Sequence, residues 1–311
     1  DRIECKMRDL RIGIMGPIRF HRVPPSKIGW LVIGLLWLVI AIPVQGAPWW
    51  SLEKVEETRQ IDTGVVYERI LLQRVTNEPV RAHILSVTGT GSLYQFGVLG
   101  SFGVLFPPSE FAKYSGAVAV INGGYFSVHP NRALGLVAAH NRILYPPHAG
   151  SQQRGAVGFL PNGILIDWIT MDDIHNNRFQ SGKEEWNQCY AALGAGPILV
   201  KKGQSRMDSS LEGFNKTQTA PRTAIAKLPD GRVLMVVIDG RQPDWSAGMT
   251  LEELTEFFLT RGVEDALNLD GGGSSIMVVQ NQVISRPSDM ALPGFPGKER
   301  AVPNVISLLK K

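Results

Sequence analysis

The residues best suited to chemistry lie in the run from Asn268 to Ser275, which reads Asn-Leu-Asp-Gly-Gly-Gly-Ser-Ser. Asp270 can take up or release a proton, and the glycines at 271–273 allow positive φ or close approach of the backbone to a ligand. Exposed N–H groups in such a loop, together with the Ser274 hydroxyl, can hold an anion. Taken alone, the run is equally typical of a glycine-rich hairpin turn, so both interpretations stay open.

Three shorter motifs place polar groups at the ends of expected strands. Asn122-Gly-Gly-Tyr-Phe follows a buried apolar run, and Asp239-Gly-Arg follows another. Pro221-Arg-Thr opens a strand, and its arginine could grip a phosphate through two parallel hydrogen bonds. Each motif alone has a plain structural explanation as a turn or a surface charge. Their meaning therefore depends on whether the fold brings them together.

One expected helix bears on that question. Thr250-Leu-Glu-Glu253 is a capping box, apolar residues follow at helical spacing, and Gly262 stands just past the end. The helix joins expected strands at 232–238 and 265–269, and such a unit is normally a right-handed crossover between parallel strands. Asp239 and Asp270 would then share the carboxyl edge of one sheet, where ligands bind in open α/β sheets. If the strand at 117–121 runs parallel to them, Asn122 joins the same edge.

The rest of the chain predicts strands joined by hairpins. Apolar and β-branched runs flank turn residues at 76–79, 161–163 and 229–231. A short helix is expected at 109–115 with Ser109 as its cap, and surface loops are expected at 171–188 and 286–300. The predicted fold class is therefore α+β: a mixed β-sheet core with hairpins, few helices and at least one right-handed strand-helix-strand crossover.

Composition argues against disorder and gives no sign of nucleic-acid binding. The 311 residues are 44% hydrophobic and 19% charged, which is enough apolar material for a full core. Residues 1–27 carry seven basic and three acidic side chains, so this segment accounts for the whole net charge of +4. The remaining chain is neutral, and the basic balance does not indicate a nucleic-acid partner.

The N-terminal segment is typical of a secretory signal. Basic residues at 19, 22 and 27 precede an apolar run at 28–42 and small residues ending at Gly46 and Ala47. Cleavage near Gly46 or Ala47 would leave a secreted or periplasmic protein. The expected domains are 1–47, an N-terminal extension and signal, and 48–311, a single domain. A retained membrane anchor is the alternative, although the run is shorter than the roughly 20 residues of a spanning helix.

Six motifs in fixed order resemble those of the phosphodiester glycosidase domain family. They are Asn-Gly-Gly-Tyr-Phe at 122–126, Gly-Pro-Ile-Leu-Val at 196–200, Pro-Arg-Thr-Ala at 221–224, Asp-Gly-Arg at 239–241, Ser-Ala-Gly-Met-Thr-Leu-Glu-Glu-Leu at 246–254 and the run at 268–275. The resemblance covers roughly residues 80–310 and makes 48–311 a phosphodiester glycosidase-like domain. It implies a hydrolase that cleaves a sugar from a glycosyl phosphodiester, with envelope or extracellular polysaccharide as the expected context.

The resemblance also gives the motif residues expected roles. A phosphate monoester leaves more readily than an alcohol, so one acid/base carboxylate and good anion stabilisation could suffice. Asp270 is the expected general base or nucleophile, and Asp239 the second carboxylate or an anchor for a sugar hydroxyl. The expected substrate-binding residues are Asn122, Gly123, Gly124, Arg222, Thr223, Arg241, Asn268, Gly271, Gly272, Gly273 and Ser274.

Two alternatives accompany this hypothesis. Asp239, Asp270 and Asn268 carry hard oxygen ligands of the kind that calcium or magnesium accepts, but no ligand spacing indicates a metal, so no cofactor is expected. The other alternative is a non-catalytic polysaccharide-binding protein of the same fold, which substrate turnover would distinguish from an enzyme.

Overall fold

The structure is a computed structural model that describes residues 48–101, 103–147, 154–180, 182–207, 215–292 and 295–311. The predicted signal at 1–47 lies outside the described residues. No helix of the described ranges combines the length and the apolar character needed to cross a membrane. The chain from Gly46 to Lys311 falls into one compact unit.

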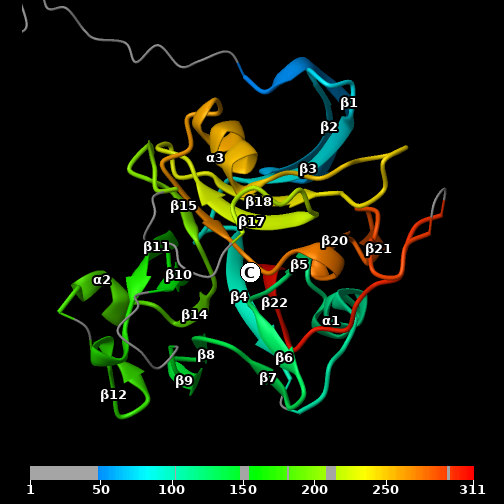
Figure 1. Ribbon diagram of the computed structural model, residues 1–311. Helices are drawn as coiled ribbons and strands as arrows, with labels where there is room; N and C mark the ends of the chain where they lie inside the picture. The colour runs from blue at the N-terminus through cyan, green and yellow to red at the C-terminus, as the bar shows by residue number, and fades with distance from the viewer. Residues whose placement is uncertain (1–47, 102, 148–153, 181, 208–214, 293–294) are drawn as a thin grey trace, which may run out of the picture. The chain divides into compact units, whose positions relative to one another are not determined.

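Three antiparallel sheets make up most of that unit (Figure 1). The largest contains, in order, β1 (Trp50–Asp62), β2 (Val65–Arg74), β3 (Pro79–Val87), β18 (Val233–Ile238), β17 (Arg222–Lys227), β19 (Asp265–Asn268), β15 (Ile198–Lys201) and β16 (Gln204–Ser205). The second contains β21 (Gln282–Val283), β20 (Met277–Val279), β5 (Ala119–Asn122), β22 (Asn304–Lys310) and β4 (Tyr94–Gly100). The third contains β11 (Gly163–Ile169), β10 (Arg154–Leu160), β14 (Ala191–Gly194), β8 (Val137–Ala139) and β9 (Arg142–Tyr145).

The α+β prediction is wrong, because the described residues form a mainly β protein. The helices α1 (Pro108–Ser115), α2 (Glu184–Asn187) and α3 (Leu251–Leu259) contain 8, 4 and 9 residues. The strands before and after α3, β18 and β19, run in the same direction, but β17 lies between them and pairs antiparallel with both. They are therefore not a neighbouring parallel pair. The local sequence pattern could not show that β17, the hairpin partner of β18, would lie between β18 and β19 in the sheet.

The central strand β18 shows how the core is organised. All six of its residues are buried. Its odd-numbered residues belong to a cluster that includes side chains of all three large sheets, and its even-numbered residues belong to a cluster that includes α3. A strand covered on both faces is apolar throughout rather than alternating. This explains why the run at 233–238 contains no polar residue.

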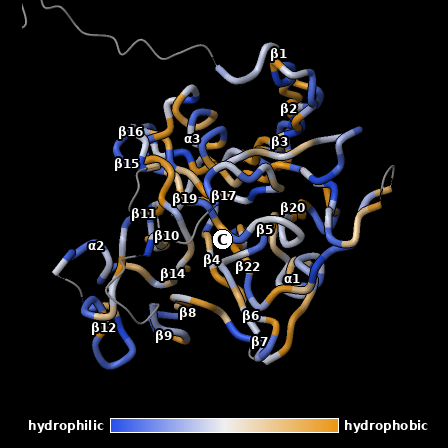
Figure 2. The backbone as a smooth tube through the Cα atoms, in the orientation of Figure 1, coloured by the Kyte–Doolittle hydropathy of each residue, from blue (hydrophilic) through white to orange (hydrophobic). Residues whose placement is uncertain are grey.

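The predicted hairpins are confirmed, and several smaller predictions are not. Strands β2 and β3, β10 and β11, and β17 and β18 each pair as expected. Helix α1 has Pro107 as its N-cap with no side-chain hydrogen bond, so Ser109 is not the cap. The 171–188 region is more structured than predicted, with the 3-10 helix η1 (Met171–Asp173), the hairpin of β12 (Ile174–His175) and β13 (Arg178–Phe179), and α2. Figure 2 shows that hairpin as mostly hydrophilic, which explains why its pattern suggested a loop.

The edge strand β1 was not predicted. It pairs with β2 along the edge of the eight-stranded sheet, and most of its residues are exposed or half-buried. Charged side chains on an exposed edge disfavour pairing with other chains, and they also remove the apolar alternation that would have revealed the strand.

Helix α3 packs one apolar face on the largest sheet, and it begins where the capping box predicted. Leu254, Phe257 and Phe258 are fully buried, and burying each such side chain is worth roughly 1.5–3 kcal/mol. The Thr250 hydroxyl accepts from the Glu253 backbone N–H at 3.0 Å, and the Glu253 carboxylate accepts from the Thr250 N–H at 2.7 Å. The same carboxylate receives the Arg74 guanidinium from β2 through two bonds of 2.7 and 2.9 Å. The cap therefore also fixes the helix to the sheet.

We expect Thr250→Ala to lower the free energy of unfolding by about 1 kcal/mol, because the Glu253 N–H loses its acceptor at the first turn. Urea denaturation followed by circular dichroism measures the change. Thr260→Ala is the matched control. The Thr260 hydroxyl donates to the Phe257 carbonyl at the other end of the helix, and that carbonyl keeps a second donor, Arg261, in the variant. Equal losses in the two variants would contradict the prediction.

Candidate active site

The run at 268–275 connects two sheets rather than forming a turn within one. Strand β19 of the eight-stranded sheet ends at Asn268, and β20 of the second sheet begins at Met277. Between them lies the short 3-10 helix η2 (Gly272–Ser274). The hairpin interpretation of the glycine run is therefore wrong. The catalytic candidate Asp270 stands where the chain leaves one sheet for the other.

The buried side chain of Asn122 holds this connection in place. Its amide nitrogen donates to the Asp270 carbonyl at 2.6 Å. Its amide oxygen accepts from the Thr223 hydroxyl at 2.7 Å and from the Ile276 N–H at 3.2 Å. Strand β5, which ends at Asn122, lies in the second sheet and not beside β18. Asn122, Thr223 and Asp270 nevertheless converge, because the ends of the two sheets meet here.

The two glycines after Asn122 let the backbone pack closely against Asn304 and Gly194, and their N–H groups bind Asn304 instead of facing a ligand. The Gly123 and Gly124 N–H groups donate to the backbone and side-chain oxygens of Asn304 at 3.0 and 2.9 Å. A Cβ on Gly123 would lie 2.0 Å from the Asn304 side-chain oxygen, and one on Gly124 would lie 2.4 Å from the Gly194 carbonyl. The Gly123 carbonyl accepts from the Asp270 N–H at 3.1 Å. Both glycines thus allow the close packing that places the Gly123 carbonyl against the Asp270 N–H.

Asn268 and Tyr125 form a second group of hydrogen bonds that fixes the start of the loop. The Asn268 amide nitrogen lies within 3.0 Å of the Tyr125 hydroxyl and of the Gly196 carbonyl, and the Tyr125 hydroxyl donates to the same carbonyl at 2.7 Å. Burial raises the pKa of Tyr125, and the charge of Asp270 raises it further. The phenol is therefore a neutral donor close to the Asp270 carboxylate.

The carboxyl group of Asp270 has the electrostatic character of a proton acceptor near neutral pH. Burial raises its pKa to about 6 from the usual 3.8, while Ser274, the Gly271 N–H and the charge of Arg300 act in the opposite direction. The Gly271 N–H donates to its Oδ1 at 2.9 Å. The Ser274 hydroxyl acts on the carboxyl group at close range, yet it makes no hydrogen bond of good geometry in the described residues. Ser274 is buried, and its hydroxyl remains able to donate.

Each of the three glycines after Asp270 lies against an arginine. A Cβ on Gly271 would lie 3.9 Å from the Arg222 side chain, and one on Gly272 would lie 2.9 Å from the Arg241 guanidinium. A Cβ on Gly273 would lie 2.5 Å from the Arg300 guanidinium. Gly272 also has φ +61°, a conformation that favours glycine. Gly272 and Gly273 thus leave room for the Arg241 and Arg300 guanidiniums, whereas Gly271 meets the Pro221 carbonyl first and touches only the aliphatic part of Arg222.

The loop amides contribute less than the sequence suggested. The Gly271 N–H is taken by the Asp270 carboxylate, and the Gly272 N–H donates to the Pro221 carbonyl at 2.9 Å. The arginines differ in how they are held. Arg222 donates from Nε to the Met249 carbonyl at 2.8 Å, whereas the exposed Arg241 guanidinium has no partner among the described residues. Burial lowers the pKa of Arg222 and the nearby charge of Arg241 lowers it further, which indicates that the two cations lie close together.

Sequence reasoning missed Arg300, Tyr125 and Ser288. Arg300 is paired with Asp289, and the Ser288 hydroxyl donates to the Gly272 carbonyl at 3.2 Å. Both come from the Pro- and Gly-rich region at 286–300, for which the sequence predicts only a loop. Tyr125 belongs to the Asn-Gly-Gly-Tyr-Phe motif, which by itself indicates no role for the tyrosine. Arg300 precedes β22 much as Arg222 opens β17, but nothing in the sequence distinguishes it from the other arginines.

Asp239 is placed at the same end of the eight-stranded sheet but does not open onto the Asp270 carboxylate. Its side chain is 1% exposed, and its oxygens accept hydrogen bonds from His83, Trp245 and the Arg286 N–H. A carboxylate with these partners cannot also contact a substrate. Its neighbour Arg241 has φ +58° and directs its guanidinium at Gly272, so of the Asp239-Gly-Arg241 motif only the arginine reaches the loop.

The described residues contain no group of three or more His, Cys, Asp or Glu side chains that could hold a metal ion. Asp239 is also occupied by protein donors, which removes it from the oxygen set considered for calcium. The expectation that no cofactor is needed stays a prediction.

Comparison with known proteins identifies related sequences over the region that contains the site. A family model described as phosphodiester glycosidase matches residues 115–309. The N-acetylglucosamine-1-phosphodiester alpha-N-acetylglucosaminidases of Bos taurus and Homo sapiens are each 26% identical over 185 residues, which is 58% of this chain. The aligned region spans about a third of those relatives, 34% and 35% of their lengths. A prophage-derived uncharacterized protein of Bacillus subtilis is 33% identical over 110 residues, 35% of this chain and 16% of that protein.

Solved structures share the fold. The catalytic domain of zebrafish N-acetylglucosamine-1-phosphodiester alpha-N-acetylglucosaminidase superimposes with a TM-score of 0.65 at 21% identity, covering 84% of this chain and 88% of that one. A hypothetical protein from Synechocystis gives a TM-score of 0.65 at 16% identity, covering 83% of this chain and 64% of that one. At these identities the likeness concerns the fold alone.

The raised pKa of Asp270 predicts a pH-dependent cost in stability. The folded state binds the proton more tightly than the unfolded chain, so this group's contribution is most favourable below about pH 4 and is lost as pH rises to about 6. Between pH 4 and pH 8 the wild type should lose about 2 kcal/mol more unfolding free energy than Asp270→Asn does. Urea denaturation across that range measures both slopes. Parallel curves for the two proteins would mean that Asp270 titrates normally.

Proposed function

This chain belongs to the phosphodiester glycosidase family, and from that premise we propose that it hydrolyses a glycosyl phosphodiester to a free sugar and a phosphate monoester. The observation that carries the proposal is the buried Asp270 carboxyl group, whose pKa is raised to about 6, on a loop of glycines with the Arg241 and Arg300 guanidiniums beside it. Arginine binds phosphate oxygens in bidentate fashion, and a carboxylate with a pKa of about 6 is ionised at neutral pH yet basic enough to accept a proton.

In the proposed reaction the phosphate oxygens bind Arg241 and Arg300, which lie beside Gly272 and Gly273, while Arg222, held by the Met249 and Gln218 carbonyls, contributes positive charge nearby. The sugar C1–O bond breaks, and the electron pair goes to the phosphate oxygen. Because the departing group is an anion that the arginines already stabilise, it needs no proton from a second carboxylate. The buried Ser274 hydroxyl acts on the Asp270 carboxyl group rather than on the substrate.

Asp270 acts in its ionised form. As a general base it takes a proton from the water that attacks C1, and as a nucleophile it would itself attack C1 before water releases the sugar. Both routes require the unprotonated carboxylate. Asn122 and Thr223 hold the Asp270 backbone in place rather than contacting the substrate, which refines their expected binding role.

We also propose that the protein is exported and acts on sugar phosphodiesters of envelope or extracellular polysaccharide. The basic and apolar segment at 19–47 supports export. The exposed, cationic character of Arg241 supports a substrate with anionic phosphate in an accessible polymer. Polysaccharide binding without turnover would instead favour the non-catalytic alternative.

We expect Asp270→Asn to lower kcat for a sugar phosphodiester by about 10²- to 10⁴-fold, because the amide keeps the acceptor for the Gly271 N–H but cannot take a proton. In the wild type, kcat/KM should rise with pH and level off above about pH 6, since the reactive form is the ionised one. Release of reducing sugar measures both. Asp230→Asn, at the exposed turn at the far end of β17 and β18, is the matched control. Full activity in Asp270→Asn would refute the assignment.

Arg241→Ala should raise KM about tenfold while leaving the midpoint of unfolding unchanged, because the guanidinium is exposed and has no protein partner to lose. Steady-state kinetics and thermal denaturation separate the two effects. Arg232→Ala removes an exposed arginine from the opposite end of the same hairpin and should change neither quantity. An unchanged KM in Arg241→Ala would remove this arginine from the phosphate site.

A further inference from the structure

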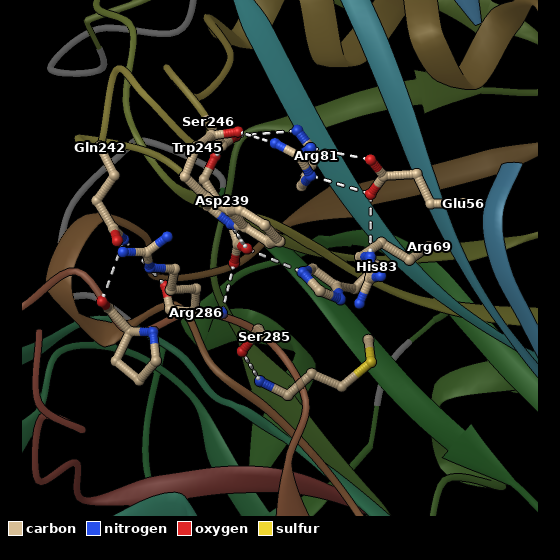
Figure 3. A network of polar contacts seen from close by, with 12 residues as sticks. Glu56, Arg69, Arg81, His83, Asp239, Gln242, Trp245, Ser246, Ser285 and Arg286 are labelled. Atoms are coloured by element: carbon tan, nitrogen blue, oxygen red, sulfur yellow. Dashed lines mark hydrogen bonds and ion pairs between the residues drawn. The ribbon is translucent and has the colours of Figure 1, made fainter. Parts of the chain in front are cut away.

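A buried polar network surrounds the Asp239 carboxylate, which the proposed reaction does not use (Figure 3). Oδ2 accepts from His83 Nε2 at 3.0 Å and from Trp245 Nε1 at 2.7 Å, and Oδ1 accepts from the Arg286 backbone N–H at 2.9 Å. The Asp239 carbonyl accepts from the Ser246 hydroxyl at 2.6 Å. Every oxygen of the residue therefore has a protein partner, and the network joins β3, the 239–246 loop and the segment after β21.

Asp239 is one of two side chains of the 239–246 loop that bind the segment around Arg286. Gln242 is also buried, and its amide nitrogen donates to the carbonyls of Arg286 and Pro287 at 3.3 and 3.2 Å. Ser285, just before them, accepts from the Met277 N–H at 2.8 Å. Asp239 thus binds the N–H of residue 286 while Gln242 binds its carbonyl. We call residues 285–289 the clamped segment.

The clamped segment leads directly to the glycine loop. Its Ser288 hydroxyl donates to the Gly272 carbonyl at 3.2 Å. Its Asp289 pairs with the Arg300 guanidinium and forms an isolated bridge with Lys298. The Arg300 guanidinium and the Asp289 carboxylate both lie within 2.7 Å of the place where a Cβ on Gly273 would stand. The position of Arg300 at the loop therefore depends on where residues 288 and 289 are held.

We propose that Asp239 is a positioning residue that, with Gln242, fixes the clamped segment and so places Ser288 and Arg300 against Gly272 and Gly273. This inference rests on the proposed function for its kinetic consequence, but the clamp itself does not. Asp239 acts through the Arg286 N–H and not on the substrate. Its neighbour Arg241 leaves the same turn toward Gly272, so one short loop sets two of the three arginines.

The burial of the network supports a positioning role. A charged carboxylate taken out of water is tolerated only where donors replace the lost hydration, and here three donors do so. On its other side the network continues from His83 Nδ1 to the hydroxyl of the buried Tyr67 at 2.9 Å. On that side the hydrogen bonds among the described residues end at a core residue rather than at the glycine loop.

The clamp can be tested by amide hydrogen exchange over residues 285–292 in the full chain. Asp239→Asn places an amide N–H₂ against donors, and Gln242→Leu removes the bonds to the two carbonyls while leaving Asp239 intact. Both variants should speed exchange in this segment by about tenfold. Tyr67→Phe is the matched control, since it removes a buried hydrogen bond from the far end of the same network. It should leave exchange at 285–292 unchanged.

The kinetic consequence separates positioning from catalysis. Asp239→Asn and Gln242→Leu should each raise KM for a sugar phosphodiester about tenfold and change kcat by less than about threefold, because they loosen a phosphate contact. Tyr67→Phe should lower the midpoint of unfolding without changing KM. Should Asp239→Asn fail to fold, Gln242→Leu tests the same segment.

Two results would overturn the inference: unchanged exchange at 285–292 in both clamp variants, or a fall in kcat for Asp239→Asn as large as that for Asp270→Asn with KM unaltered. If the wild type shows no turnover, the proposed function fails on its own. Exchange at 285–292 then still decides whether Asp239 and Gln242 hold the segment.

Discussion

The hydrogen bonds of the Asn122 side chain are the interaction on which the site depends. A loop of three glycines has little conformational preference of its own, so its shape must come from outside. Asn122 provides that shape by donating to the Asp270 carbonyl and accepting from Thr223 and Ile276, on both sides of the glycines. The amide carries its donor and its acceptor on two separate atoms, so one side chain can serve groups on both sides of the loop. An apolar residue would leave several buried polar groups unpaired, at roughly 1–3 kcal/mol each.

With the backbone fixed, the glycines serve the arginines. Arg222 and Arg241 carry like charges, and the charge of Arg241 adds to the larger effect of burial in lowering the pKa of Arg222. Arg300 is paired with Asp289, and in the proposed function a bound phosphate would balance the remaining positive charge. The positive charge nevertheless fails to keep the Asp270 pKa low, since burial outweighs Arg300, Ser274 and the Gly271 N–H. Under the proposed function the site would combine arginines that bind an anion with a carboxylate that remains basic, and the burial of Asp270 is what keeps it basic beside a cation.

The sequence predicted local features better than their assembly. Turn residues and β-branched runs located three hairpins, and the Thr250–Glu253 box located α3, because these signals act over a few residues. The fold class failed at β17, whose position between β18 and β19 is a long-range fact that no local pattern contains. Arg300 and Ser288 were missed for the same reason. Their importance arises only from contact with glycines that are more than a dozen residues away in sequence.

Asp239 and Asp270 show why residue type and strand position do not assign a role. Both are aspartates that follow a buried strand, both precede a glycine, and β18 and β19 bring both to the same end of one sheet. They differ in the donors that reach them. Asp239 accepts hydrogen bonds from an imidazole, an indole and a backbone N–H, and its side chain is buried. Its carboxylate therefore stabilises the protein structure. Asp270 receives the adjacent N–H and the charge of Arg300, and its raised pKa is what suits it to the base role in the proposed function.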